Sequence, residues 1–260
     1  MAPARLRVLV PVREDPDLGS VLRILVSLAA LRPLDPTLLR IVPPSADVAA
    51  AREASNPYLD RFRKRGFRAR LMVGSGDPLR EILICARTGF DWIALATRGR
   101  RGLRRALLGS LAEEILRRSP VPVLAFRPDV RPGDWRHTAV ALDGTRGAES
   151  ILPEAGRMAK ACGTPLQLIH VQALTGVYKG GAYLERVRQK MEKTDVVCMP
   201  VLHRGSPARQ ILRHLRGQPV GLLCMATHGR TGVGRILLGS VAERVLRRAP
   251  CAVLIRRIAR

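Results

Sequence analysis

The chain has 260 residues, enough for two domains of roughly 130 residues each, and its 47% hydrophobic content lets each half bury a core of its own. No apolar run approaches the ~18 residues of a membrane-spanning helix, and the N-terminal residues become charged too soon for a secretory signal. The net charge of +24 makes nucleic-acid binding a candidate function, which has to be weighed against the other features of the sequence.

In the first half, strands and helices alternate. The elements expected from apolar periodicity are, in chain order, a strand at residues 6–12, a helix at 18–31, strands at 37–42 and 69–73, a helix beginning at 78, a strand at 91–97, a helix at 110–118 and a strand at 121–126. Between the second and third strands, residues 51–67 are expected to form one charged amphipathic helix.

The second half repeats this order. Its expected elements are strands at residues 137–143, 166–171, 196–202, 221–227 and 251–256, with helices at 150–162, 178–193, from 207 onward, and at 240–248. Strands that are apolar nearly throughout, alternating with helices, indicate a parallel sheet covered on both faces. We therefore predict an α/β fold of two tandem doubly wound, Rossmann-like domains, each with a five-stranded parallel sheet.

A duplication explains the repeated order. The residues LLGS occur at 107–110 and again at 237–240, a spacing of 130 residues. When residues 96–127 are aligned with 226–257 without gaps, 19 of the 32 positions are identical, which indicates a tandem repeat. We place the domains at residues 1–130 and 134–260, because the segment RPDVRPGDW between them contains two prolines and a glycine.

Each half carries two glycine-marked turns where a doubly wound sheet binds ligands. Gly99 and Gly229 follow the fourth strand, and Gly109 and Gly239 precede the next helix. Such sheets bind ligands beyond the carboxyl ends of their strands, where a helix start attracts anions. Since glycine lets backbone amides approach phosphate oxygens closely, these turns predict a phosphate site.

A helix cap is the competing explanation for part of this pattern. Ser110 with Glu113, and Ser240 with Glu243, match the S-x-x-E capping box. In such a box the serine oxygen accepts from an amide in the first turn, and the glutamate reaches back to the cap amide. The cap leaves the glycine ten residues upstream unexplained, so the phosphate interpretation is favoured.

The motif also carries a family resemblance. The pattern G/A-x-x-G-x9-G-S/T after a strand, closing with VAERVLRRAPCAVLIRR, resembles the ATP-binding branch of the universal stress protein family over both halves of the chain. The resemblance implies ATP, with or without Mg²⁺, as the ligand. It also implies that the glycine motif holds the phosphates and ribose. An acidic residue ending the first strand and an apolar residue ending the second would hold the nucleoside.

The second half fits this pattern position by position. Asp143 takes the acidic position and Val171 the apolar one, while Ala226 stands where glycine is also common. The nucleotide-binding residues that the resemblance implies here are Ala141, Asp143, Val171, Ala226, Gly229, Gly239, Ser240 and Val241.

The first half departs from the pattern at one position. Arg13 stands where the acidic residue is expected, and a guanidinium cannot accept a hydrogen bond from a nucleoside. The remaining positions match, and the implied residues are Val12, Ile41, Ala96, Gly99, Gly109 and Ser110. We therefore expect a degenerate nucleoside site here, and tighter ATP binding in the second half.

No catalytic motif accompanies these sites. The chain lacks a GxSxG nucleophile elbow, a P-loop and an HExxH pair, so we expect slow ATP hydrolysis at most, from a nucleotide-responsive regulatory protein of stress tolerance. No cluster of His, Cys and carboxylates has metal-ligand spacing, so no metal site is expected from protein ligands alone. Five scattered cysteines without a C-x-x-C pair suit reduced thiols in a cytoplasmic protein.

Two alternatives to an adenine-nucleotide partner remain open. A nucleotide-independent scaffold of the same fold would use the glycine turns only as structure. A charge-driven nucleic-acid binder would explain the net charge. However, the arginines are spread over both halves, and aromatic residues make up only 3% of the chain, which leaves few platforms for stacking bases. Nucleic acid is therefore the less favoured partner.

The final strands of the two halves predict how the domains associate. Residues 121–126 and 251–256 are apolar and would each expose an unpaired sheet edge. We expect them to pair antiparallel within the chain, about a pseudo-two-fold axis. Association of two chains into a dimer is a further expectation.

Overall fold

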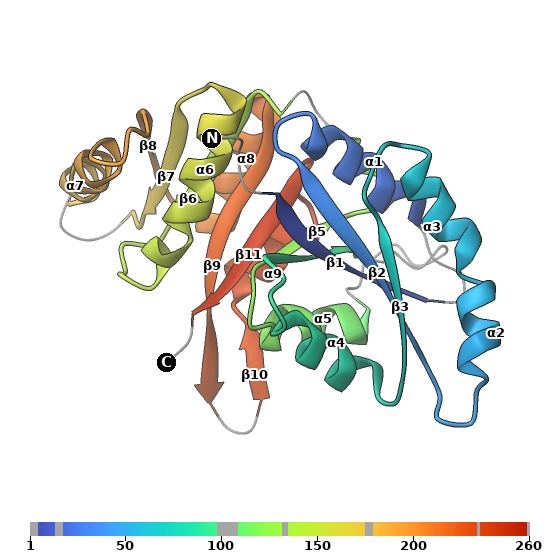
Figure 1. Ribbon diagram of the computed structural model, residues 1–260. Helices are drawn as coiled ribbons and strands as arrows, with labels where there is room; N and C mark the ends of the chain where they lie inside the picture. Colours follow the sequence, from blue (N-terminus) through green and yellow to red (C-terminus); the bar gives the residue numbers. More distant parts are fainter. Residues whose placement is uncertain are drawn as a thin grey trace. The chain divides into compact units, whose positions relative to one another are not determined.

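The computed structural model describes residues 5–13, 18–97, 109–131, 135–174, 179–232 and 235–258. The chain divides into two compact units, Met1–Asp129 and Val130–Arg260. Each unit is a parallel sheet flanked by helices, as Figure 1 shows. The predicted α/β fold, with two repeats of about five parallel strands, is confirmed. The pairing of the two units with each other stays a prediction.

The first unit follows the predicted order of elements. Its elements are β1 (Leu6–Val12), α1 (Leu18–Ala29), β2 (Leu34–Val42), α2 (Val48–Glu53), α3 (Asn56–Arg63), β3 (Arg70–Ser75), α4 (Pro78–Ala86), β4 (Trp92–Ala96), α5 (Ser110–Arg118) and β5 (Val123–Phe126). The strands lie in the order β3-β2-β1-β4-β5, and all neighbours are parallel.

The second unit repeats this arrangement. Its elements are β6 (His137–Leu142), η1 (Ala148–Ile151), α6 (Leu152–Cys162), β7 (Leu166–Gln172), α7 (Gly180–Glu192), β8 (Cys198–Arg204), α8 (Pro207–Gly217), β9 (Val220–Gly232), β10 (Arg235–Leu238), α9 (Ser240–Leu246) and β11 (Ala252–Ile258). The parallel strands lie in the order β8-β7-β6-β9-β11, and β10 pairs antiparallel with β9.

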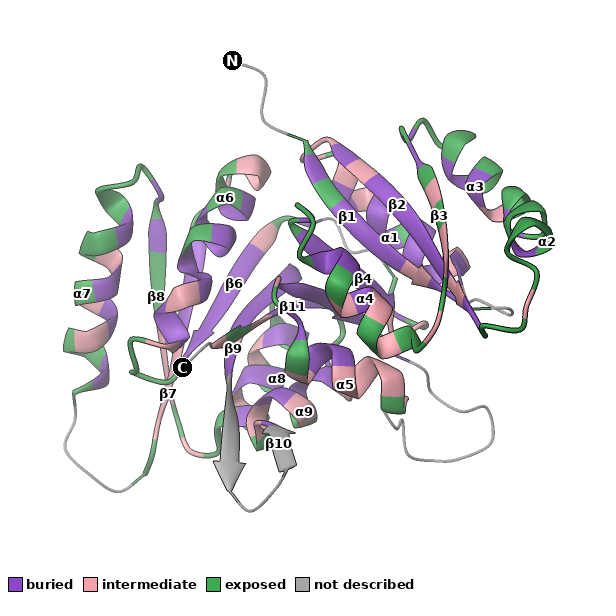
Figure 2. Cartoon of the chain, turned by 60° about the horizontal axis from the view of Figure 1, so that its bottom comes forward, coloured by how far each residue is buried: buried purple, intermediate pink, exposed green. Residues whose placement is uncertain are grey.

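Helices cover both faces of each sheet because the connections between parallel strands cross over it. In the first unit, α1, α2 and α3 lie on one face, and α4 and α5 lie together on the other (Figure 1). The central strands are consequently buried, whereas the outer faces of the helices are exposed (Figure 2). In β1, for example, Val8, Leu9 and Val10 are fully buried. Burial on both faces is why these strands are apolar throughout.

One expected element is wrong. Residues 51–67 were expected to form a single helix, but α2 ends at Glu53 and α3 begins at Asn56. Pro57 lies in the first turn of α3, where its missing N–H costs nothing. Inside a continuous helix the same proline would remove a hydrogen bond and clash with the preceding turn, so the chain restarts there.

No helix in the described ranges is both long enough and apolar enough to cross a membrane.

Candidate functional site

The second unit contains a cavity of about 460 Å³ at the carboxyl ends of β6 and β7, beside residues 225–227 of β9. Its lining residues are Ala141, Leu142, Asp143, Ile169, Val171, Pro207, Ile211, Met225, Ala226, Thr227, Gly239, Ser240, Val241 and Ala242. Seven of the eight residues predicted for this half therefore surround one cavity. The eighth, Gly229, lies further along β9.

The cavity lies where the strand order reverses. β6 is flanked by β7 on one side and β9 on the other, so the connections leaving β6 and β9 run to opposite faces of the sheet. Diverging connections leave a crevice outside the carboxyl ends of these strands, which is the general ligand position in doubly wound sheets. Asp143 directly follows β6, and Ala226 lies on β9.

The segment around Gly229 differs from the prediction. A turn was expected directly after residue 227, but β9 continues to Gly232 and forms a hairpin with β10. In this hairpin Gly229 lies opposite Leu238, the residue before Gly239. The two glycines, ten residues apart in sequence, are thus brought close together by strand pairing.

The predicted capping boxes are also corrected. The N-cap residues are Gly109 and Gly239, one position before the serines, and neither helix has a side-chain hydrogen bond at its cap. Glu243 contacts Arg247 at 2.6 Å instead of reaching back to the cap. Since the serine lies inside the first turn, its hydroxyl is misplaced for capping.

Gly239 has no packing reason to be glycine. Its φ is −32°, outside the left-handed region, and a Cβ atom at this position would meet no atom of the described residues within 4 Å. At Gly109, the corresponding residue of the first unit, a Cβ atom would likewise meet no described atom within 4 Å. The backbone at these positions therefore faces a space that a ligand can approach.

Asp143 is held by a tight local turn. Its Oδ1 atom accepts from the Thr145 backbone N–H at 2.9 Å and from the Thr145 hydroxyl at 2.7 Å. The Thr145 Oγ1 atom in turn accepts from the Ala148 N–H at 3.1 Å, which joins the turn to η1. An exposed carboxylate fixed in this way can accept hydrogen bonds from a ligand without first losing side-chain freedom.

An aromatic pair connects the end of β6 to α7. His170 Nδ1 lies 2.9 Å from the Leu142 carbonyl oxygen, and the His170 ring lies 5.2 Å from the Tyr183 ring, centroid to centroid. Burial, with the nearby charges of Glu149 and Asp143, raises the pKa of Tyr183 to about 12. Tyr183 therefore stays neutral, and the pair serves as a fixed support beside the Asp143 turn.

Several lining residues were not predicted. Met225 and Thr227 flank Ala226 on β9, while Pro207 and Ile211 belong to α8. Thr227 is 6% exposed, and the same Ala-Thr pair recurs as Ala96 and Thr97 in the first unit. That repetition was a sequence signal that could have included Thr227. The α8 residues had the same kind of signal, since Pro207 and Ile211 correspond to Pro78 and Ile82 of the first half.

The first unit has two cavities in the corresponding region. One of about 750 Å³ is lined by Val12, Ile41 and Ser110, among others, and one of about 120 Å³ by Ala96 and Gly109. Arg13 lines both. The predicted residue Gly99 lies outside the described residues.

No protein-held metal site is found among the residues that the structure describes: they contain no group of three or more His, Cys, Asp or Glu side chains that could hold an ion. All five cysteines are free thiols. Burial raises the pKa of Cys251 to about 12 and that of Cys198 to about 11, so neither supplies a reactive thiolate near neutral pH.

The family profile and the individual relatives that match this chain belong to the same protein family. The sequence profile of the Universal stress protein family matches residues 5–127 and 134–257. A universal stress protein of Methanocaldococcus jannaschii is 39% identical over 77 residues, which cover 30% of this chain and 45% of that protein. One from Mycobacterium tuberculosis is 29% identical over 185 residues, covering 64% of this chain and 62% of that protein. The chain thus spans less than two thirds of these two relatives.

Solved structures show the same fold. The crystal structure of a universal stress protein from Archaeoglobus fulgidus has a TM-score of 0.83 at 22% identity, covering 97% of this chain and 98% of that one. A putative universal stress protein from Pseudomonas aeruginosa has a TM-score of 0.73 at 21% identity, covering 98% and 94%.

Proposed function

The chain belongs to the universal stress protein family, and we propose that its second unit binds ATP, with or without Mg²⁺, as part of a nucleotide-responsive regulatory protein of stress tolerance. The observation that carries this proposal is the convergence of seven predicted residues on one cavity. These residues come from four separate segments of the chain, so the sequence spacing alone would not bring them together.

The chemistry of the cavity suits an adenine nucleotide. Its volume of about 460 Å³ falls within the ~300–1,000 Å³ of small-molecule sites. Val171, Ile169 and Met225 give it apolar walls for a flat base, and Asp143 adds an acceptor for a nucleoside N–H or O–H group. At the other end, the backbone around Gly239 is open to phosphate oxygens.

We propose that the first unit binds ATP more weakly. Its cavity has Arg13 where the second unit has Asp143, so the acceptor for the nucleoside is lost. Gly109 keeps the open backbone of the phosphate end. The expected difference is one missing hydrogen bond to a charged group, about 1.5–3 kcal/mol of binding free energy.

Titration calorimetry with ATP on Gly239→Val tests the proposal. The valine side chain would occupy the space that the phosphates need, so we expect ATP binding to be lost while the protein stays folded. Gly217→Val is the matched control, because Gly217 is exposed at the end of α8 and its Cβ would also meet no atom within 4 Å.

Two outcomes would reject the proposal. If Gly239→Val is folded and binds ATP with the native affinity, the phosphate end is wrongly assigned. If the native protein shows no ATP affinity tighter than about millimolar, a nucleotide-independent scaffold is the better description.

Three finer expectations accompany this function. The five free thiols suit a reducing, cytoplasmic location. Because the sequence contains no GxSxG nucleophile elbow, P-loop or HExxH pair, we expect ATP hydrolysis to be slow at most. Dimerisation of two chains stays a prediction.

A further inference from the structure

The second unit has another cavity, of about 540 Å³, between α6 and α7. Its lining comes from the segment after β6, from η1 and α6, and from the end of α7 with the loop that follows it. It shares no lining residue with the proposed nucleotide site. We call it the α6–α7 groove.

The floor of the groove is apolar. It is formed by the buried residues Leu152 and Gly156 of α6 together with Met191 and Val196, and the exposed Pro153 adds to the apolar lining. A Cβ atom on Gly156 would lie 2.9 Å from Met191 Cε and 3.1 Å from Val196 Cγ2. Glycine therefore allows α6 to pack closely against these two side chains, which close the bottom of the groove.

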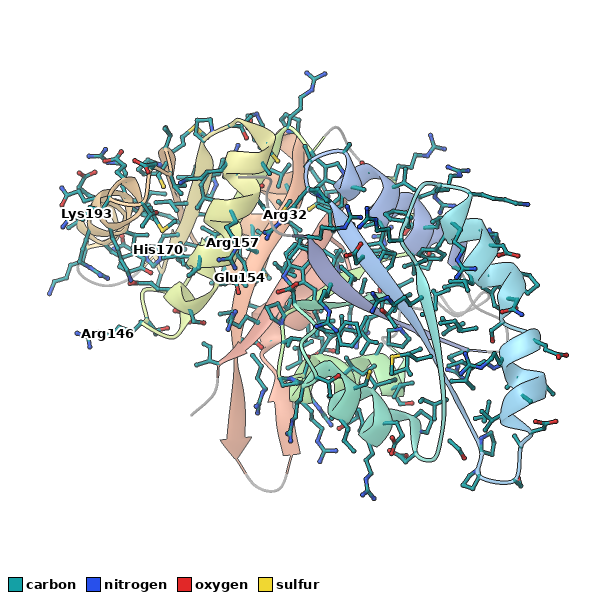
Figure 3. The ribbon with its side chains drawn as sticks, viewed as in Figure 1. Arg32, Arg146, Glu154, Arg157, His170 and Lys193 are labelled. Carbon is teal, nitrogen blue, oxygen red and sulfur yellow. The ribbon has the colours of Figure 1, made fainter. Side chains whose placement is uncertain are left out.

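The rim of the groove is cationic. Arg146, Arg157, Lys160 and Lys190 surround it, and Glu149 is the one carboxylate in its lining. Figure 3 shows the Arg146 side chain extending from the segment after β6, apart from Arg157 on α6. Basic groups thus reach the groove from separate elements.

The single carboxylate does not neutralise this rim. Glu149 is 6% exposed, and its two oxygens are bound by Arg186 at 2.9 Å and by Lys190 at 3.0 Å. Arg157 lies 3.6 Å from Glu154. Arg146 and Lys160, by contrast, form no ion pair with any carboxylate of the described residues, so their charge is available to an anion.

We propose that the α6–α7 groove binds a small amphipathic anion, with its apolar body on the floor and its carboxylate or phosphate held by Arg146 and Lys160. The volume of the groove lies within the ~300–1,000 Å³ of small-molecule sites. The apolar floor favours a hydrocarbon or aromatic body, since burial of such a body is the main source of its affinity. This proposal does not depend on nucleotide binding by the other cavity.

A fluorescent amphipathic anion, 8-anilinonaphthalene-1-sulfonate, is a direct probe of the groove. Titration of the full chain is expected to give saturable binding. The double variant Arg146→Glu/Lys160→Glu is expected to weaken it by about tenfold or more, because two charge-assisted contacts are lost. The matched control is Arg209→Glu/Arg216→Glu, which makes the same change of net charge at exposed positions on α8. Circular dichroism and thermal melting check that each variant is folded.

Competition identifies the kind of ligand. Decanoate is expected to displace the dye at a lower concentration than the uncharged 1-decanol, and ATP is not expected to displace it. The proposal is overturned if the native chain binds no dye, if the groove variant binds like the native protein, or if the control weakens binding equally. Displacement by ATP would also overturn it, because the dye would then occupy the nucleotide site.

Discussion

Asp143 and Thr145 are joined by two hydrogen bonds to a single carboxylate oxygen, at 2.9 Å from the Thr145 backbone nitrogen and 2.7 Å from its hydroxyl. This turn immediately follows β6, at the mouth of the proposed nucleotide cavity. Because Asp143 Oδ1 accepts both hydrogen bonds of the turn, Oδ2 is the carboxylate oxygen available to a ligand. The two side chains therefore have different expected roles. The Asp143 carboxylate contacts the ligand, and the Thr145 hydroxyl holds that carboxylate in position.

Asp143→Ala and Thr145→Val are therefore expected to differ. Loss of the carboxylate should weaken ATP binding by about 1.5–3 kcal/mol, since a hydrogen bond to a charged group is lost. Thr145→Val keeps the carboxylate and the backbone bond, so it should weaken binding by less than about 1 kcal/mol. Calorimetry on both variants tests this order. If both variants lose the same binding free energy, Asp143 acts only by holding the turn and does not contact the ligand.

Arg13→Asp is expected to improve ATP binding in the first unit. The substitution places an acceptor at the end of β1, beside a cavity that already exists. The number of tightly bound ATP molecules per chain, measured by equilibrium dialysis, should rise from one to two. Arg68→Asp, an exposed position in the same unit, makes the same charge change and should leave this number unaltered. An unchanged value in Arg13→Asp would mean that the first cavity is unsuited to a nucleoside for another reason.

Glu149→Gln is expected to destabilise the second unit by roughly 1–3 kcal/mol, because two charge-assisted hydrogen bonds to a buried carboxylate are lost. Burial alone would raise the pKa of Glu149, but the hydrogen bonds from Lys190 and Arg186 outweigh it and lower the pKa below 4.5. The stabilisation is thus present above about pH 4.5 and is lost as the pH falls through the lowered value.

Chemical denaturation of Glu149→Gln at neutral and acidic pH checks both points. The difference in free energy of unfolding between this variant and the native protein should shrink in acid, because the native carboxyl also becomes protonated there. Glu185→Gln is a suitable control, because Glu185 pairs with Arg188 on the same helix at a partly exposed position, whereas Glu149 is buried. A constant difference at every pH would contradict the proposed role of the charge.

We expect a second loss of stability in mild acid, caused by a pair of histidines. His203 Nε2 on β8 lies 3.3 Å from His214 Nδ1 on α8, and His214 Nε2 lies 2.7 Å from Gln167 Oε1. Burial, followed by the charge of Arg213, lowers the pKa of His203, and burial followed by His203 lowers that of His214. Below the unperturbed pKa of 6.5 the unfolded chain then binds more protons than the native one, so stability falls with the pH.

Denaturation midpoints measured between pH 7.5 and 5.5 test this pair. The native protein should lose stability over that interval, and His203→Gln should lose less, since it removes one of the two protonation sites. If the two profiles are parallel, the histidine pair does not control the transition.

The sequence by itself determined the repeated α/β pattern and the position of the candidate cavity in the second unit. Both depend on features that repeat locally: apolar strands such as β1, proline at the start of α4 and α8, and glycine before α5 and α9. Parallel strands place their carboxyl ends on one edge, so Asp143, Val171 and Ala226 could be expected to meet there.

Only the tertiary structure decided the features that depend on distant partners. The β9–β10 hairpin replaced a turn because strand pairing satisfies the backbone groups around Gly229. Glu149 contacts Lys190, which lies 41 residues later in the sequence, and no periodic pattern of residues predicts such a contact. The α6–α7 groove likewise arises from the packing of Gly156 against Met191 and Val196. Local propensity acts over a few residues, whereas these contacts form only when separate segments are brought together by the burial of the sheet.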